Sequence, residues 1–561
     1  MEFKDLFRKK DIGKMVADAE ERALHGHGGM VKNLNVRDLT AMGIAAIIGA
    51  GIFSTVGKAC VDGGPAISLL YVFTAVACLF SALCYAEFAS RVPISGSAYT
   101  YAYTTFGELI AWIIGWNLVF EYAIGNITVA ISWSQYFVSL LEKGLHLHVP
   151  AYWQLDYVSA YKAFTDPANE LAHDVSAEAV ALGKTAWETA PRLFGLRMIA
   201  NLPTLLLTFL ISWLIIRGIK ESKRASNIMV AVKLTVVFLV LIIGVFYIDT
   251  SNWSPFAPNG YGSILKGVSA VFFAYIGFDA VSTTAEECNN PQRDLPRAML
   301  YSLAICTILY VLVCLVLTGM VSYKELGVGD ALSYVFGKVH LYFIEKIVAI
   351  SAVFAMGSVF LVFQLGQPRI WMAMSRDGLL PARFGKIHPK FKTPVFSSVV
   401  AGFVVAIPSL FMNLTQVTDL CSIGTLFAFA LVSGGILILE EDKSGKPGFK
   451  APYINGAYIT PILFVATLVV FIKYKPETFD LVHFSPSVIP SLVFFIIFGF
   501  VSYHGFIRKW SLIPVLGLMT NLYLMTELGI VNWTRFGIWC VLGFIIYFAY
   551  GYKKSKLNIA N

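Results

Sequence analysis

The chain has 561 residues, of which 57% are hydrophobic and only 14% are charged, and its mean hydropathy is +0.68. Soluble domains contain about 45–50% apolar residues, so this composition excludes an ordinary soluble protein and indicates a polytopic membrane protein. The formal charge of +8 does not indicate a nucleic-acid partner, because the basic residues are spread over short loops and form no single patch.

Hydrophobic segments near the spanning length recur from Leu39 to Tyr550, about 14 of them at roughly 20 residues each, and this length excludes a β-barrel. The first residues, MEFKDLFRKKDIGKM, lack the apolar core of a secretory signal peptide, so residues 1–38 are expected to form a cytoplasmic leader. If the spans alternate, the basic loops fall on one side, which the positive-inside rule places in the cytoplasm. We therefore expect an integral protein of the plasma or inner membrane, with both termini, including the tail 553–561, in the cytoplasm.

The first span, residues 39–58, contains glycines where a continuous helix would least accommodate them. Gly49 and Gly51 are separated by one residue, and each glycine costs a helix interior roughly 1 kcal/mol relative to alanine. In lipid, every freed N–H and C=O group needs a partner, which a ligand can supply. The alternative is a face of small residues that lets two intact helices pack closely.

The third span carries Glu121 in apolar surroundings. A carboxylate at that depth must face the bundle interior or a water-filled cavity, so it indicates a functional site unless a neighbouring helix supplies a fixed partner. The polar segment 142–197 follows and is expected to form an extracellular cap of short helices. Its histidines, His146, His148 and His173, have no regular ligand spacing and predict no metal site. The eight cysteines lie mostly in apolar segments and are interpreted as small buried hydrophobic residues.

The fourth span is predicted at about 198–216, the basic segment 217–224 is predicted to be a cytoplasmic loop, and the fifth span is predicted to begin near Asn227. Lys233 then lies about 9 Å into the fifth span at 1.5 Å per residue. Its ammonium group either extends to the cytoplasmic interface or sits in an internal cavity where it can gain and lose a proton.

The sixth span is again apolar and again interrupted by a glycine, in the segment from Val271 to Thr284 that contains Gly277 and Asp279. Interrupted spans at corresponding positions of two halves indicate the central site of an inverted-repeat transporter. Glycines that serve only helix packing do not need this spacing. The second interruption therefore favours a broken-helix binding site over a packing face.

Several motifs together resemble the amino acid-polyamine-organocation superfamily, and specifically its cationic amino acid transporter-like branch. The first span from Gly43 to Phe53 is similar to the GIGAIIGAGIF signature of that family and departs from it only at Ala45. The other matching segments are Phe273–Glu287, Asn290–Pro296, Gly366–Arg369, Met374–Pro381 and Gly424–Ala430. The resemblance covers most of the chain.

The resemblance implies an all-α membrane protein with a leucine-transporter-like 5+5 inverted repeat. Residues 39–248 would form the first repeat and residues 249–440 the second, while residues 441–552 would add four helices to make 14 transmembrane helices. The substrate would lie between the breaks of spans one and six. The N–H groups of Gly49, Ala50 and Gly51 would bind its carboxylate, and carbonyls near Ile47, Phe273, Ala274 and Ile276 would bind its amine, with Phe273 also serving as an aromatic lid.

The same resemblance implies roles for three further side chains. Lys233 is similar in position to the lysine of proton-coupled members, so its protonation would couple transport and would disfavour a sodium ion nearby. Glu121 would face the central cavity, where it would attract basic side chains or, less directly, support the proton path. Met356 stands where a smaller residue would leave room for a long substrate, which favours small neutral amino acids.

The sequence therefore predicts a secondary active transporter that imports small neutral L-amino acids such as alanine by proton symport and alternating access. The alternatives are a transporter of cationic amino acids (Arg or Lys) and an amino acid sensor or transceptor without net transport. No Walker A, His-Glu-x-x-His or Gly-x-Ser-x-Gly motif occurs, so an enzyme is not expected. The expected partners are the amino acid, protons and membrane lipid; no cofactor, metal or nucleic acid is expected, and a small membrane subunit cannot be read from the sequence.

Overall fold

The computed structural model of the chain describes residues 6–10, 13, 33–92, 94, 97–144, 146–167, 177–260, 264–439, 448–479 and 485–559. Most of the predicted leader 1–38, the histidine His173 and the last two residues of the predicted tail lie outside the described residues.

Helices dominate the described chain, as the length of the hydrophobic segments predicts. Nine of the described helices are long and apolar enough to cross a membrane, and four shorter apolar helices accompany them. The elements of the first half are α2 (Val36–Ile47), η2 (Gly51–Thr55), α3 (Val56–Gly63), α4 (Ile67–Arg91), α5 (Ala98–Thr105), α6 (Glu108–Ser139), α7 (Tyr157–Thr165), α9 (Ala177–Thr189), β1 (Arg192–Leu193), β2 (Leu196–Arg197), α10 (Pro203–Arg217) and α11 (Ile219–Gly244). Those of the second half are α13 (Val268–Tyr275), η9 (Phe278–Glu287), α14 (Pro291–Met320), α15 (Ala331–Lys338), α16 (Tyr342–Arg376), α17 (Val395–Ser409), α18 (Leu414–Ile438), α19 (Ile459–Tyr474), α20 (Ile489–Arg508), α21 (Leu512–Thr526), α22 (Ile530–Ile546), α23 (Tyr552–Lys554) and α24 (Lys556–Ile559).

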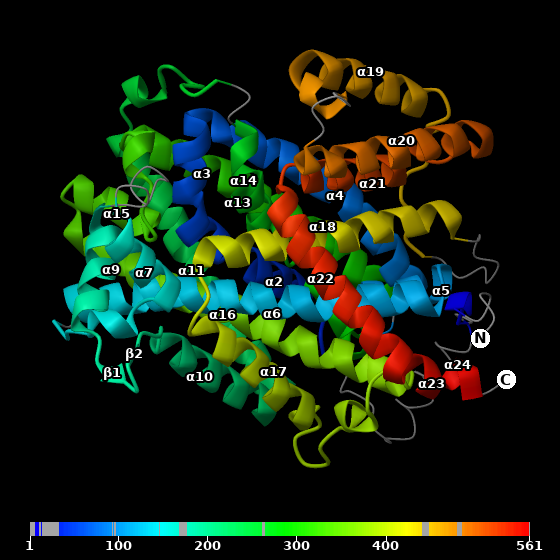
Figure 1. Cartoon of the computed structure of the whole chain (residues 1–561), viewed down its shortest axis with the longest axis horizontal. Helices are drawn as coiled ribbons and strands as arrows, with labels where there is room; N and C mark the ends of the chain where they lie inside the picture. The colour runs from blue at the N-terminus through cyan, green and yellow to red at the C-terminus, as the bar shows by residue number, and fades with distance from the viewer. Residues whose placement is uncertain are drawn as a thin grey trace.

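The long helices run side by side, and the short helices α2 and α13 lie at the centre of the bundle (Figure 1). Helix α6 packs against α16 and α18, while α14 packs against α2 and α4. Large apolar side chains such as Phe209 on α10, which is 70% exposed, cover the outside of the bundle, whereas Glu121 and Lys233 are buried inside it. Apolar side chains outside and polar side chains inside are the arrangement that a lipid solvent favours.

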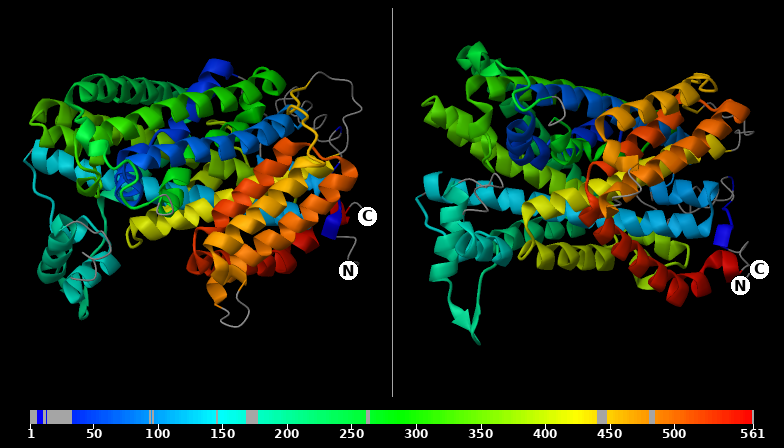
Figure 2. Two further views of the ribbon diagram at one scale, coloured as in Figure 1. Left: turned by 90° about the horizontal axis from the view of Figure 1, so that it is seen from above. Right: turned by 45° about the horizontal axis from the view of Figure 1, so that its top comes forward.

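Helices α19 and α20 form a separate small hydrophobic core with part of α21. Figure 2 shows this pair along one side of the bundle. The core is rich in phenylalanine, and Phe471 and Phe495 meet edge to face with ring centroids 5.0 Å apart. Helices α19 and α20 are therefore attached to the central bundle chiefly through α21.

The structure differs from the sequence prediction at three places between the third and fifth spans. Helix α10 begins at Pro203, because residues 200 and 202 donate backbone hydrogen bonds to Tyr152 and Trp153 before the helix starts. The segment predicted as the loop 217–224 is mostly the first turns of α11, which begins at Ile219, and only Gly218, with φ of 135°, breaks the chain there. The segment 142–197 contains the expected short helices but ends in an unpredicted two-stranded hairpin.

The two ends of the described chain meet at one end of the bundle, which we call the terminal end. The Arg8 guanidinium donates to the Leu557 carbonyl over 3.3 Å, and the Glu108 N–H group donates to the Arg8 carbonyl over 3.0 Å. Figure 1 shows both termini on this side, with α7, α9 and the hairpin at the opposite end. An even number of membrane crossings is consistent with this arrangement.

Candidate functional site

The first span is broken where Gly49 and Gly51 stand. Helix α2 ends at Ile47, and Ile48 has the extended conformation φ −76°, ψ 101°. The chain resumes as a widened π-helical turn from Gly51 to Thr55, in which Ile52 and Phe53 donate to the Gly49 carbonyl over 3.1 Å. Because Gly49 is the first acceptor of this new helix, the N–H groups of residues 49–51 are at its N-terminus, where the helix itself offers no acceptor.

The sixth span is broken in the same way. Helix α13 ends at Tyr275, Ile276 is extended with φ −61° and ψ 135°, and Gly277 has a φ of 121°. Side chains rarely allow that φ value, so the glycine is required for the break. The span then continues as η9 from Phe278.

The two breaks pack directly against one another. A Cβ atom on Gly51 would lie 2.6 Å from the Ala274 Cβ atom, and one on Gly277 would lie 2.7 Å from the Ala46 Cβ atom. The glycines of each span thus have two effects. They break the helix of their own span, and they allow the other span to approach closely. The structure brings the predicted residues Ile47, Gly49, Ala50, Gly51, Phe273, Ala274 and Ile276 into one central region, and all of them are buried.

Lys233 reaches the end of α2 from α11. Its Nζ atom lies 2.6 Å from the Ile48 carbonyl oxygen, 2.9 Å from that of Ala45 and 3.4 Å from that of Ile44. The side chain is fully buried, so it does not extend to the membrane interface. An ammonium group at a helix C-terminus interacts favourably with the carbonyl dipoles that the helix leaves unpaired. Lys233 therefore fixes the first half of span one to α11 at the break.

Tyr310 on α14 joins the two breaks, and the sequence analysis missed it. Its hydroxyl oxygen lies 2.6 Å from the Ile47 carbonyl oxygen and 2.8 Å from that of Ala274. Since a hydroxyl group has a single proton, it donates to one of these carbonyls at a time. A single tyrosine in an apolar span has no local sequence signal, so this bridge follows only from the tertiary arrangement.

Helix α16 covers the break of span one. The Val359 side chain lies against Gly49, where a Cβ atom would be 3.2 Å from the Val359 Cβ atom. The Ser358 hydroxyl oxygen is 3.5 Å from the Ala45 carbonyl oxygen. Met356 is fully buried about one helical turn before Val359, on the same side of the helix. The structure thus places Met356 on the helix that encloses the break.

Glu121 lies among a group of buried polar side chains on the η9 side of the breaks. It faces α18, where a Cβ atom on Gly424 would lie 4.0 Å from the Glu121 Cβ atom, and it interacts electrostatically with Asp279. Within the described chain, its Oε2 atom has no hydrogen-bond partner. Tyr85 and Tyr122 are close enough to interact electrostatically with both carboxylates. Asp279 was visible in the sixth-span motif but was not assigned to the site.

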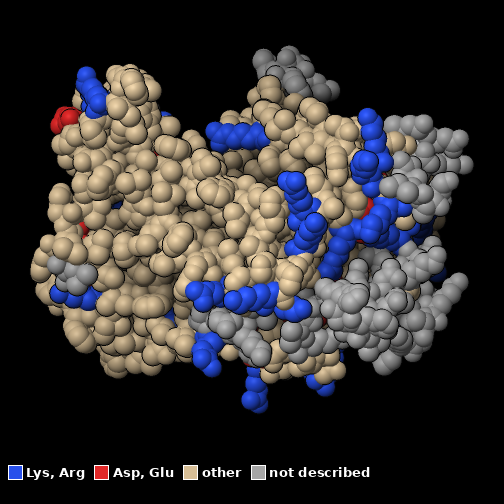
Figure 3. Space-filling model, turned by 90° about the horizontal axis from the view of Figure 1, so that it is seen from below, with Lys and Arg blue, Asp and Glu red and all other residues tan. Residues whose placement is uncertain are grey.

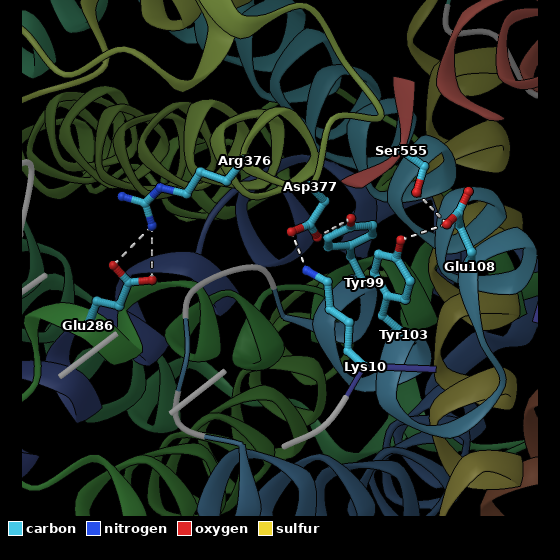
Figure 4. A network of polar contacts seen from close by, with 8 residues as sticks. All are labelled: Lys10, Tyr99, Tyr103, Glu108, Glu286, Arg376, Asp377 and Ser555. Atoms are coloured by element: carbon cyan, nitrogen blue, oxygen red, sulfur yellow. Dashed lines mark hydrogen bonds and ion pairs between the residues drawn. The ribbon is translucent and has the colours of Figure 1, made fainter. Parts of the chain in front are cut away.

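Two ion pairs lie between the breaks and the terminal end. The Arg369 guanidinium on α16 and the Glu287 carboxylate on η9 are 2.6 Å apart, and both are buried. Nearer the terminal end, Arg376 and Glu286 are 3.3 Å apart (Figure 4). The N–H groups of residues 33 and 34 also donate to the Glu287 carbonyl, over 2.9 and 3.0 Å. The start of α2, the end of η9 and the end of α16 are thereby held together.

A second polar network lies beside these pairs (Figure 4). Asp377 accepts hydrogen bonds from Lys10 and Tyr99, and the distance from the Tyr99 hydroxyl is 2.5 Å. The network attaches the described part of the leader and α5 to the end of α16. The sequence analysis assigned no role to these residues, because they are far apart in the chain.

Comparisons with known proteins give sequence matches along most of the chain. The sequence model of a family described as "Amino acid permease" matches residues 34–501, which include both breaks, Lys233 and Glu121, and one described as "C-terminus of AA_permease" matches residues 512–555. The chain is 37% identical to the branched-chain amino acid permease BcaP of Bacillus subtilis (strain 168) and 34% identical to a methylthioribose transporter of the same organism, each over 99% of both chains. It is 31% identical to cationic amino acid transporter 9, chloroplastic, of Arabidopsis thaliana, over 97% of this chain and 92% of the relative.

Proposed function

The chain belongs to the amino acid permease family, within the amino acid-polyamine-organocation superfamily, and on that premise we propose that it imports small neutral L-amino acids such as alanine by proton symport. The observation that carries this proposal is the paired break of spans one and six with the Lys233 ammonium group at the end of α2. A titratable cation at that point gives the protonation state a direct effect on the position of α2.

The substrate zwitterion lies between the two breaks. Its carboxylate accepts hydrogen bonds from the N–H groups of Gly49, Ala50 and Gly51, because a helix N-terminus favours an anion. Its ammonium group is held by carbonyl groups of residues 47, 273, 274 and 276, where the helices end. The Phe273 ring covers the bound molecule as a lid.

Transport follows from breaking the contacts between Lys233 and α2. When Lys233 is protonated, its hydrogen bonds hold α2 against α11 and the site is closed toward the terminal end. As α2 separates from α11 and the ion pairs of Arg369 and Arg376 break, water enters from that end and takes the proton from Lys233, which removes most of this attraction. The substrate and the proton then leave on the same side, which is symport by alternating access.

We propose that the helices form 14 membrane spans, with residues 39–248 and 249–440 as two inverted repeats and the four spans within 441–552 added at the end. The terminal end lies in the cytoplasm. Most of the Lys and Arg side chains on the face shown in Figure 3 lie over the half of the molecule toward this end, as the positive-inside rule requires of a cytoplasmic side.

The size of the substrate is limited by Met356, whose long side chain occupies room beside the break. The name of one relative, a branched-chain amino acid permease, supports an aliphatic neutral substrate. The second candidate function is transport of cationic amino acids. It is favoured by the buried carboxylates of Glu121 and Asp279, which would stabilise a basic side chain, and by the name of the Arabidopsis relative.

The test uses the full chain purified and reconstituted in proteoliposomes. A thermal-shift panel of the amino acids identifies the ligand, and uptake of that ligand is then measured with and without an inward proton gradient. We expect alanine or another small neutral amino acid to bind and to accumulate only with the gradient. Preference for arginine or lysine would favour the second candidate. Binding without accumulation would indicate a sensor and would refute transport.

A further inference from the structure

The hairpin before α10 carries an exposed apolar tip at a strained position. Strands β1 and β2 pair Arg192 with Arg197 and residue 193 with residue 196, so Phe194 and Gly195 form a two-residue turn. Both turn residues have positive φ values, 51° and 83°. Turns of this kind favour Asn-Gly, Asp-Gly or Gly-Gly, because a bulky side chain is strained at positive φ. Here the strained position holds a phenylalanine.

The side chains at this turn make few contacts within the protein that could offset the backbone strain. The Phe194 side chain is 97% exposed, and its neighbours Leu196 and Leu193 are 68% and 53% exposed. A Cβ atom on Gly195 would have no neighbour within 4 Å in the described structure. An apolar tip that is both strained and uncovered indicates a partner outside the chain.

The position of the hairpin indicates that this partner is the lipid bilayer. Figures 1 and 2 show the hairpin projecting from the bundle beside the start of α10, at the end opposite the termini. A backbone hydrogen bond of 3.0 Å from Leu202 to Trp153 fixes the level at which α10 begins. From there α10 presents exposed apolar side chains such as Leu206 and Phe209. The apolar tip thus continues a surface that faces lipid.

Exposed aromatic residues mark the same level of the molecule. Trp153, Tyr157, Tyr161 and Phe164 are all exposed on the segment that packs beside the hairpin. Aromatic side chains of this kind gather where membrane and water meet. The basic residues of the hairpin are also suited to the membrane–water interface. Arg192 is exposed, and the Arg197 guanidinium is held over the Trp187 ring at 4.5 Å.

We propose that residues 192–198 form a membrane-anchoring hairpin that binds anionic phospholipid. Leu193, Phe194 and Leu196 enter the boundary between headgroups and acyl chains, and the two arginines contact lipid phosphates. Burial of the Phe194 ring in lipid then offsets the cost of its strained backbone and of its exposure to water. The anchor also fixes the cap formed by α7 and α9 relative to the membrane surface at the start of α10. It goes beyond the proposed transport function and does not depend on it.

The experiment places a spin label at position 194 and measures its depth in the membrane. Because Cys540 is the one cysteine of the chain that is not fully buried, the background variant is Cys540→Ser. Phe194→Cys and the control Lys184→Cys on the exposed face of α9 are labelled with a nitroxide and inserted into nanodiscs that contain phosphatidylglycerol. Power saturation then compares access by oxygen, which concentrates in lipid, with access by a water-soluble nickel complex.

We expect the label at 194 to be more accessible to oxygen than to nickel, and the label at 184 to show the reverse. Adding Arg192→Gln, or replacing phosphatidylglycerol by phosphatidylcholine, should shift the 194 label toward nickel access. Equal nickel access at both positions would overturn the proposal. A 194 label shielded from both reagents would also overturn it, since that result indicates a protein contact. Size-exclusion profiles matching the background variant control for folding, and no step requires transport activity.

Discussion

Replacing Lys233 by methionine tests the coupling mechanism most directly. The change keeps an unbranched side chain of similar length and removes the ammonium group. It eliminates two short hydrogen bonds, to the Ile48 and Ala45 carbonyls, and a longer one to Ile44. Hydrogen bonds to a charged group contribute about 1.5–3 kcal/mol each, so the two short bonds stabilise the attachment of α2 to α11 by about 3–6 kcal/mol at most. Even 3 kcal/mol corresponds to a change of roughly a hundredfold in a conformational equilibrium.

The assay is uptake of the best ligand into proteoliposomes with an imposed pH difference of one unit. If one proton moves with each substrate, this gradient supports about tenfold accumulation, because one pH unit is about 1.4 kcal/mol. We expect Lys233→Met to show no accumulation while it still exchanges labelled for unlabelled substrate across the membrane. The matched control is Lys346→Met on α16, which removes an exposed ammonium group.

One result would refute this reasoning: unchanged gradient-driven accumulation in Lys233→Met, with the control behaving like the unmodified protein. Loss of both exchange and accumulation would instead indicate that Lys233 is needed for the site itself. Circular dichroism and size-exclusion chromatography of each variant show whether it is folded.

Four further changes test other parts of the site. Gly51→Leu should abolish ligand binding because the new side chain collides with the backbone of span six, and an unchanged ligand-induced thermal shift would contradict the assignment. Tyr310→Phe removes the one hydroxyl proton that the Ile47 and Ala274 carbonyls share, which costs about 1–3 kcal/mol, and we expect a lower melting temperature and weaker binding; normal values would show that the hydroxyl does not join the breaks. Met356→Ser should widen the competition profile toward longer or basic amino acids, so an identical profile would argue against the size limit. Arg369→Gln leaves the buried carboxylate of Glu287 without its counter-charge and should destabilise the protein by about 3–5 kcal/mol. Adding Glu287→Gln should restore most of the melting temperature. Equal losses of melting temperature in the single and double variants would show that the two side chains do not form a stabilising ion pair.

Local sequence signals identified the centre of the fold correctly. The glycines at 49, 51 and 277 predicted interruptions in two apolar segments, and the structure has extended residues at 48 and 276. Such signals are readable because glycine in an apolar span has a conformational meaning that its neighbours do not change. The depth of Lys233 was readable from the number of residues between it and the predicted start of its span, although the choice between interface and interior needed the structure.

The rest depended on contacts between distant residues. Tyr310, Val359 and the pair of Arg369 with Glu287 have no local pattern that distinguishes them from other residues of apolar helices. The start of α10 was misplaced because residues 198–202 are apolar enough for a span, whereas their backbone groups bond to the segment around Trp153. The roles proposed for Glu121 and Met356 stay predictions.

The buried carboxylate of Glu108, at the terminal end, accepts hydrogen bonds from residues that are synthesised early and late in the chain. It accepts hydrogen bonds of 3.0 Å from Tyr103, which is synthesised just before it, and of 2.5 Å from Ser555 (Figure 4). It also accepts a hydrogen bond of 2.9 Å from Tyr547. The last two partners exist only when nearly the whole chain has been translated. Until then a buried acid at the start of α6 lacks two of these three donors, which is costly in an apolar environment. Assembly of this end is therefore completed last, and a chain truncated before residue 547 retains a defect at the opposite end of its own sequence.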